Sequence, residues 1–346
     1  MSKAPQTYLD FVQIGSEALL KASQPYIDCN LKSTVRMSIF GGSLFVAKLA
    51  SCLAIVTGSA AAQPPSNIQA SSWIAVDGES GQTLVEYNAD TERQPASLTK
   101  LMTAYIVFDA LKRGTMRWDE KLLVNAADID QIGNDEAKMY LVPGQQVPVK
   151  KLVEGLIAAS ANDAALVLAE RVGGSLAGFE QLMNSTARRL GMDHTHYSTP
   201  SGITTPGNYS TVRDLSTLAL RITRDFPEYY VFSSEQHFAY GSFQKRNKNW
   251  LLGNDISVDG MKTGRTQAAG YCIVATAMRQ QLSPPMKRRV FAILLGAPTA
   301  SDRIVGAGSL LNYGFTAYKD YPIADSSGLR IVTRMSPSLF VQLNRP

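Results

Sequence analysis

The spacing of hydrophobic and polar positions divides the chain into strand-like ends and a helical middle. Two short apolar runs at residues 72–76 and 83–87 flank a polar, glycine-containing segment, and this pattern predicts a β-hairpin. From Ser97 onward the apolar positions recur at helical spacing, which predicts α-helices. The expected helices run from Ser97 to near Gly114 and over residues 151–158, 164–172, 176–190 and 211–224.

The second half of the chain returns to the pattern of strands. Residues 261–266, 270–278 and 289–295 are expected to be strands, followed by a turn at 296–300 and a last helix at 302–315. Because strands stand at both ends with helices between them, we expect an α/β (α+β) fold. Its antiparallel sheet would be built from both termini, with helices packed on it and a helical subdomain inserted between the strands.

The N-terminal region has the pattern of an export signal. Lys32 and Arg36 precede a mostly apolar run at residues 44–57, and small residues then offer an Ala-x-Ala cleavage point after Ala62. We therefore expect a signal peptide at residues 37–62 and export of the mature chain to the periplasm or cell envelope. The alternative is a short membrane anchor that is not cleaved.

Composition divides the rest of the chain into one main domain and short flanking segments. Residues 1–36 would be an extended or non-native N-terminus, with translation starting near Met37. Residues 63–70 are expected to be a linker, and residues 71–320 the main globular domain. Residues 321–346 are too few for a second domain and lack the long amphipathic pattern of an anchor, so no membrane anchor is expected after cleavage.

Composition and charge argue against several other classes of function. The net charge is +5 and no dense run of lysine and arginine occurs, so nucleic-acid binding is not expected. Cys29 and Cys52 fall in the segment expected to be removed, although Cys52 could instead carry a lipid, which leaves Cys272 as a buried, inert thiol. His194 and His196 lack acidic or cysteine partners at useful spacing, so neither a metal nor another cofactor is predicted.

The first candidate for chemistry is a serine and a lysine at the start of the first helix. Ser97 and Lys100 are three residues apart, and residues at this spacing share a helix face. A serine hydroxyl is a weak nucleophile unless a base takes its proton, and a lysine can be that base if burial or a second cation depresses its pKa. The spacing alone equally fits a helix-capping serine followed by a surface lysine.

A second candidate lies in the turn between two expected helices. Ser160 and Asn162 are two residues apart, so they do not share a helix face and the segment is expected to connect the helices. Asn162 or Asp163 could simply cap the following helix. In the functional interpretation, Ser160 and Asn162 lie in one cleft, where they relay a proton and hold a substrate amide.

A third candidate is the strand segment Lys262-Thr263-Gly264. Lys262 offers a cation and Thr263 a hydroxyl donor, a combination suited to a carboxylate. Gly264 has no side chain and would let a ligand approach the backbone closely. Strand alternation puts Lys262 and Thr263 on opposite faces, so periodicity alone does not bring both to one site.

Together and in this order, the three motifs are those of penicillin-binding proteins and class A β-lactamases. The sequence resembles the low-molecular-mass penicillin-binding proteins, the serine D-Ala-D-Ala carboxypeptidases of peptidase family S11, from about Ile74 to Tyr318. This resemblance implies a β-lactamase/transpeptidase-like fold, peptidoglycan stem peptides as substrates, β-lactam antibiotics as acylating inhibitors and no cofactor. The segments that carry the resemblance are residues 96–103, 160–164, 247–252, 258–264 and 269–271.

The resemblance implies a catalytic role for four residues. Ser97 would attack the penultimate D-Ala carbonyl of a stem peptide and form an acyl-enzyme, with Lys100 as its general base. Ser160 would pass a proton to the departing D-Ala nitrogen. Asn162 would hold Lys100 and the substrate amide.

The resemblance also implies a set of substrate-binding residues. Lys262 and Thr263 would bind the terminal carboxylate of the peptide, beside Gly264. The main-chain N–H groups of Ser97 and Arg265 would form the oxyanion hole that stabilises the tetrahedral intermediate.

Three other functions stay open at the level of sequence. An endopeptidase of the same family would cut D-Ala–diaminopimelate cross-links, and a wall-binding protein would keep the groove with little catalysis. A class A β-lactamase needs a carboxylate that activates the deacylating water, a Glu in a loop after the second motif. Here the loop at residues 191–208 offers only Asp193. The motifs do not decide between hydrolysis and transfer to another amine.

Overall fold

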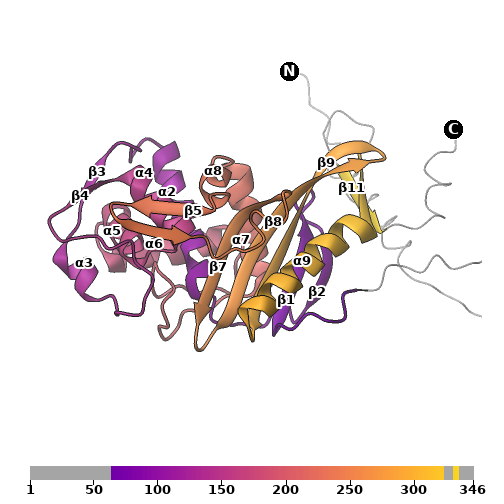
Figure 1. Ribbon diagram of the computed structural model, residues 1–346, viewed down its shortest axis with the longest axis horizontal. Helices are drawn as coiled ribbons and strands as arrows, with labels where there is room; N and C mark the ends of the chain where they lie inside the picture. Colours follow the sequence, from indigo (N-terminus) through magenta and orange to yellow (C-terminus); the bar gives the residue numbers. More distant parts are fainter. Residues whose placement is uncertain (1–63, 323–329, 335–346) are drawn as a thin grey trace, which may run out of the picture. The chain divides into compact units, whose positions relative to one another are not determined.

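The fold is described for residues 64–322 and 330–334 of a computed structural model (Figure 1), and every structural statement below concerns these residues. The expected N-terminal segment 1–36 and signal peptide 37–62 lie outside them, as does most of the expected C-terminal tail. Within the described part, no helix is both long and apolar enough to span a lipid bilayer.

A five-stranded antiparallel sheet forms the centre of the fold, in the order β2–β1–β9–β8–β7. Its strands come from both ends of the chain, because β1 pairs with β2 on one side and with β9 on the other. This arrangement confirms the predicted sheet built from the two termini. The strands are β1 (Ser72–Asp77), β2 (Thr83–Tyr87), β7 (Val258–Thr266), β8 (Gly270–Leu282) and β9 (Pro285–Ala297).

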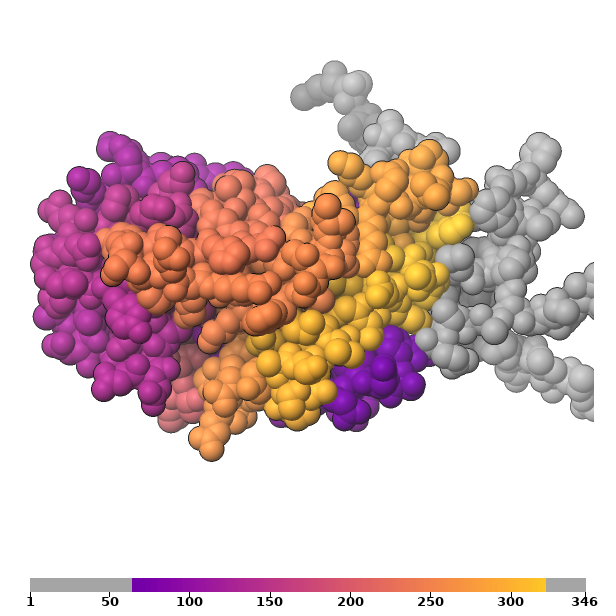
Figure 2. Space-filling model, in the orientation of Figure 1, coloured from indigo at the N-terminus to yellow at the C-terminus, as the bar shows by residue number. Residues whose placement is uncertain are grey.

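Both faces of the sheet are covered by helices. The long helix α9 (Ala300–Ala317) packs along one face, and on the surface shown in Figure 2 it lies in yellow beside the orange strands. Along β1, Ile74 and Val76 join the core under the helical region, whereas Trp73 and Ala75 join the core under α9. Because neither face is exposed to water, the central strands are apolar at consecutive positions.

The other described helices are inserted between β2 and β7, which confirms the predicted helical subdomain. The helix α2 lies at its centre and is buried on almost every side. The inserted helices are η1 (Ala96–Thr99), α2 (Lys100–Lys112), α3 (Ala126–Asp130), α4 (Val149–Glu154), η2 (Gly155–Ala159), α5 (Asn162–Gly173), α6 (Leu176–Arg189), α7 (Val212–Asp225) and α8 (Tyr229–Ser233). Two small hairpins accompany them, β3 (Lys121–Leu123) with β4 (Gln146–Pro148), and β5 (His237–Tyr240) with β6 (Phe243–Arg246).

The helix expected at residues 151–158 ends differently from the prediction. It is α-helical only to Glu154, and Gly155–Ala159 form a π-helical turn. The turn delivers Ser160 in the left-handed conformation, with φ of 59°. Apolar periodicity cannot separate these helix types in a short buried run, so the distinction depends on tertiary contacts.

The C-terminal part of the described chain also departs from the expected boundaries. β9 continues to Ala297 and α9 begins at Ala300, so the turn expected at residues 296–300 is shorter. β10 (Tyr318–Pro322) pairs antiparallel with β11 (Arg330–Arg334). The chain therefore passes the expected domain end at residue 320 within a strand, and the proposed domain boundaries stay predictions.

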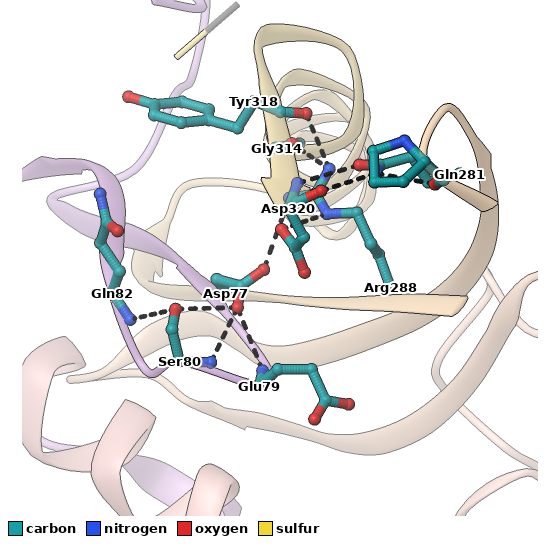
Figure 3. Close-up of polar contacts among 10 residues, drawn as sticks. Asp77, Glu79, Ser80, Gln82, Gln281, Arg288, Gly314, Tyr318 and Asp320 are labelled. Atoms are coloured by element: carbon teal, nitrogen blue, oxygen red, sulfur yellow. Dashed lines mark hydrogen bonds and ion pairs between the residues drawn. The ribbon is translucent and has the colours of Figure 1, made fainter. Parts of the chain in front are cut away.

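A buried cluster of charges ties the first hairpin to this last part of the chain (Figure 3). Arg288 on β9 donates to Asp320 Oδ1 at 2.6 Å and to Asp77 Oδ2 at 3.4 Å, and these side chains are at most 2% exposed. Its remaining N–H groups reach the main-chain oxygens of Gly314 and Tyr318. Burial and the nearby charge of Asp77 raise the pKa of Asp320 to about 6, because one guanidinium serves two carboxylates.

Replacing Arg288, the cation that Asp77 and Asp320 share, should make the protein easier to unfold. We expect Arg288→Met to lower the free energy of unfolding by about 3–5 kcal/mol, since it leaves two carboxylates buried without their partner. The control is Arg113→Met, which breaks an ion pair with Asp109 whose side chains are 57% and 33% exposed. That change should cost less than about 1 kcal/mol. Urea unfolding measures both, and equal effects would contradict a structural role for the buried cluster.

Candidate active site

The turn that leads into α2 places a serine hydroxyl beside a lysine amine. Ser97 lies in η1, and Lys100 is the first residue of α2. Lys100 Nζ donates to Ser97 Oγ at 3.3 Å, which is the contact that a three-residue spacing on one helix face allows. The same nitrogen donates to Asn162 Oδ1 at 2.6 Å and to the main-chain oxygen of Ser201.

The environment of this lysine changes its acidity. The side chain of Lys100 is 1% exposed because α2 is surrounded by other elements. Burial lowers its pKa to about 7, the negative charges of Glu136 and Asp163 oppose the shift, and the charge of Lys245 adds to it. An amine with this pKa is partly neutral at neutral pH and can accept a proton from the adjacent hydroxyl.

The second motif lies where the π-turn meets α5. The left-handed backbone of Ser160 interrupts the helices, so Asn162 begins α5 and faces the first motif. Asn162 Oδ1 accepts from Lys100 as described, while its Nδ2 donates to Glu136 Oε2 at 2.7 Å. Ser160 Oγ accepts from Lys262 Nζ at 2.8 Å, which links this motif to the third. The predicted connecting turn therefore joins two elements and contacts both other motifs.

The third motif lies on β7, the last strand of the sheet. Lys262 Nζ bends back to the main-chain oxygen of Thr263 at 2.9 Å as well as to Ser160. Burial, followed by the charge of Lys100, lowers the pKa of Lys262 well below its ordinary value. Both Lys262 and Thr263 border one cavity, although they alternate along the strand, because β7 is an edge strand whose free side faces η1.

The absence of a side chain at Gly264 brings this strand edge against the serine turn. A Cβ at Gly264 would lie 3.0 Å from the main-chain nitrogen of Ser97 and 3.1 Å from the main-chain oxygen of Pro95. Contacts this short require the neighbouring backbone to move. The glycine at position 264 therefore allows β7 to lie as close to Ser97 as it does in this fold.

One cavity of about 430 Å³ joins the three motifs, a volume typical of small-molecule sites. Lys100 lies beneath its wall, and the other seven residues predicted for the site line it: Ser97, Ser160, Asn162, Lys262, Thr263, Gly264 and Arg265. The geometry thus brings together every residue that the sequence motifs singled out.

Four charged residues outside the predicted site set also line this cavity, namely Asp135, Glu136, Lys248 and Arg303, and two of them contact or adjoin the motifs. Glu136 comes from the polar segment between α3 and β4, and Arg303 from the first turns of α9. Arg303 is 3% exposed, donates to the main-chain oxygen of Lys248, and its Nε has no partner among the described atoms. No sequence motif identifies Glu136 or Arg303, because each residue reaches the cavity only through the packing of elements that are distant in sequence.

The remaining candidate ligands lie away from this cavity. His194 Nδ1 is 3.5 Å from a carboxylate oxygen of Glu92, and His196 Nδ1 contacts the main-chain oxygen of Gly207. Across residues 64–322, no group of three or more His, Cys, Asp and Glu side chains has the arrangement of a metal site. Cys272 is fully buried on β8, and burial raises the pKa of its thiol to about 11, in agreement with the predicted inert thiol.

A serine hydroxyl beside a buried amine, with a second serine and a second amine in the same cavity, is typical of acyl-transferring serine enzymes that use a lysine base. The comparison of the chain with known proteins agrees with this class. The chain belongs to the peptidase S11 family, described as D-alanyl-D-alanine carboxypeptidase, which it matches over residues 58–299.

Individual relatives support this assignment. D-alanyl-D-alanine carboxypeptidase DacA of Haemophilus influenzae is 36% identical over 258 residues, which are 74% of this chain and 64% of that protein. The chain spans 62% to 64% of the length of such curated relatives. Penicillin-binding protein 6B from Escherichia coli has a TM-score of 0.74 and 33% identity, over 80% of this chain and 87% of that one.

A complex of a further relative extends the comparison. The structure of penicillin-binding protein D2 from Listeria monocytogenes in its cefotaxime-bound form has a TM-score of 0.66 and 33% identity. It covers 73% of this chain and all of that one. These likenesses confirm the predicted family and its penicillin-binding-protein fold.

The close approach at Gly264 generates a prediction about reactivity. We expect Gly264→Ala to slow acylation of Ser97 by a fluorescent penicillin up to about tenfold, because the added Cβ displaces the serine turn by less than the roughly 1 Å that costs about a hundredfold. Gly308→Ala is the control, since the nearest atom to its added Cβ is 3.8 Å away. Stopped-flow labelling measures both rates, and an unchanged rate in Gly264→Ala would show that β7 tolerates the side chain.

Proposed function

We propose that this protein is a serine-type D-Ala-D-Ala carboxypeptidase, a hydrolase that removes the terminal D-Ala from peptidoglycan stem pentapeptides. The observation that carries the proposal is the shared cavity, in which Ser97 Oγ contacts the buried amine of Lys100 and Ser160 Oγ contacts Lys262. Membership of the S11 family supports the same activity.

In the proposed acylation, Lys100 takes the proton of Ser97 while Ser97 Oγ attacks the carbonyl carbon of the penultimate D-Ala. The oxyanion that forms would accept hydrogen bonds from the main-chain N–H groups of Ser97 and Arg265. Ser160 accepts a hydrogen bond from Lys262, so its own hydroxyl proton is free to pass to the departing nitrogen. The proton that Lys100 took from Ser97 then replaces the one that Ser160 gave up, so Lys100 is neutral again. The C–N bond then breaks, and the terminal D-Ala leaves.

In the proposed deacylation, a water molecule attacks the ester carbonyl. Lys100 accepts the proton of this water and passes it to Ser97 Oγ as the ester bond breaks, which restores the hydroxyl of Ser97 and the neutral amine of Lys100. The products are the shortened stem peptide and the free enzyme.

The cationic side of the cavity supports recognition of the terminal carboxylate. Lys262 and Thr263 would bind this group, and Arg265 contributes its positive charge to the same wall. Arg303 is buried beside them with an unpartnered Nε, so we add it to the proposed carboxylate site. A buried guanidinium without a carboxylate partner is costly unless a ligand supplies the negative charge.

We also propose that β-lactam antibiotics acylate Ser97. Penicillin-binding protein D2 of Listeria monocytogenes has been solved in ampicillin- and cefotaxime-bound forms, and it shares the fold of this chain. Action on peptidoglycan requires export, so we place the enzyme in the periplasm or cell envelope. This localisation depends on the predicted signal at residues 37–62.

The β-lactamase alternative lacks support in the described chain. Its deacylating carboxylate would come from the loop after the second motif, but Asp193 is exposed and does not line the cavity. The endopeptidase alternative would use the same cavity on a cross-linked substrate, so only substrate assays separate it from the proposed activity.

Two substrates and two variants test the proposed function. With the mature protein, we expect long-lived labelling of Ser97 by a fluorescent penicillin and release of D-Ala from a stem pentapeptide. Ser97→Ala should abolish both, whereas Lys262→Ala should mainly raise KM for substrates with a free carboxylate. Rapid penicillin turnover without D-Ala release would instead identify a lactamase, and cleavage of cross-linked dimers alone an endopeptidase.

The lowered pKa of Lys100 predicts how acylation depends on pH. Below about pH 7 the amine is protonated and cannot act as a base, and above it the amine is neutral, so the labelling rate should rise through a midpoint near 7. Stopped-flow rates from about pH 5 to about pH 9 measure this midpoint. Lys100→Arg stays charged throughout and should not label. A flat profile for the unmodified protein would exclude Lys100 as the base.

A further inference from the structure

A carboxylate outside the three motifs contacts the catalytic residues. Glu136 Oε2 accepts from Asn162 Nδ2 at 2.7 Å, and Asn162 Oδ1 accepts from Lys100 Nζ at 2.6 Å. Lys100 in turn donates to Ser97 Oγ at 3.3 Å. A chain of hydrogen bonds therefore runs from the rim of the cavity to the nucleophile. We propose that Glu136 is a positioning residue, which fixes the amide orientation of Asn162 and so directs the amine of Lys100 at Ser97.

The hydrogen-bonding groups of Glu136 and Asn162 explain why a carboxylate at position 136 fixes the orientation of the Asn162 amide. The two ends of an asparagine amide have nearly the same shape, so the hydrogen-bond network determines which end faces which neighbour. An ionised carboxylate only accepts, so the NH2 group of Asn162 must face Glu136 and its oxygen must face Lys100. The reversed amide would set N–H groups against the N–H groups of Lys100, and Asn162 is only 4% exposed, so water could not compensate.

The main chain around Glu136 is fixed to the same helix as Asn162. The main-chain nitrogen of Asn162 donates to the oxygen of Ala137 at 2.7 Å. The buried carboxylate of Asp163 accepts from the main-chain nitrogens of Met139 and Leu141 at 3.0 to 3.1 Å. These contacts do not involve the Glu136 side chain. Replacing that side chain therefore changes the hydrogen bond to Asn162 while the loop keeps its attachment.

Glu136 also acts on Lys100 through its charge. The charged groups that shift the pKa of Lys100 are Glu136 and Asp163, which favour its ammonium form, and Lys245, which disfavours it. Removing the charge of Glu136 should lower the pKa of Lys100 further. The pH midpoint of acylation should then move to lower pH, although the maximal rate falls because the amine is less well directed. Loosening of the loop alone would reduce the rate without moving the midpoint.

This inference rests on the proposed function, and its test uses the same fluorescent penicillin. We expect Glu136→Gln to lower the maximal rate of Ser97 labelling on the order of tenfold and to shift the pH midpoint downward. The matched control is Asp130→Asn, which removes a carboxylate from an exposed position at the end of α3. The control should label like the unmodified protein at every pH.

A double-mutant cycle separates positioning through Asn162 from other effects. If Glu136 acts through Asn162, then Glu136→Gln should have little further effect on the maximal rate in an Asn162→Ala background. The inference is overturned if Glu136→Gln lowers the labelling rate as much in the Asn162→Ala background as in the unmodified protein. It is also overturned if Glu136→Gln alone leaves the rate and the pH midpoint unchanged. In both cases, penicillin labelling of the unmodified protein would still support the proposed function. No labelling and no D-Ala release by the unmodified protein would overturn both.

Discussion

The cost of keeping an ammonium group out of water governs this site. Lys100 lies on a helix that is surrounded by other elements, so its charged form loses hydration and its pKa falls to about 7. A lysine at the surface would hold its proton at neutral pH and could not serve as a base. The proposed reactivity of Ser97 therefore depends on where the fold places α2.

The rest of the fold supplies that burial and brings a second amine to the same place. The sheet is closed on both faces by helices, and only its last strand, β7, presents a free edge to the serine turn. Gly264 allows that edge to approach Ser97, which also carries Lys262 into contact with Ser160. The charge of Lys100 also disfavours the ammonium form of Lys262, which adds to the effect of burial on that second amine.

Basic and acidic side chains line different parts of the cavity, and this arrangement suits the proposed substrate. Arg265 and Arg303 line the cavity together with Lys262, and a terminal carboxylate bound there would favour the charged form of Lys262, whereas Glu136 contacts Asn162. The separation lets one region recognise the substrate by charge while the other orients the proton-transfer groups. The pKa of Lys100 stays lowered beside Glu136 and Asp163 because burial acts on its amine more strongly than these carboxylates do, and the charge of Lys245 adds to the effect of burial.

The sequence by itself determined the strands at both ends, the helices between them and the residues of the three motifs, because hydrophobic periodicity and short-range spacing are local properties. Tertiary structure decided that these motifs meet, since Lys100 and Asn162 are 62 residues apart and Ser160 and Lys262 are 102 apart. Tertiary structure also determined that a π-helical turn precedes Ser160 and that Glu136 and Arg303 line the cavity. Burial and the charges that set a pKa come from elements distant in sequence, so no local pattern specifies them.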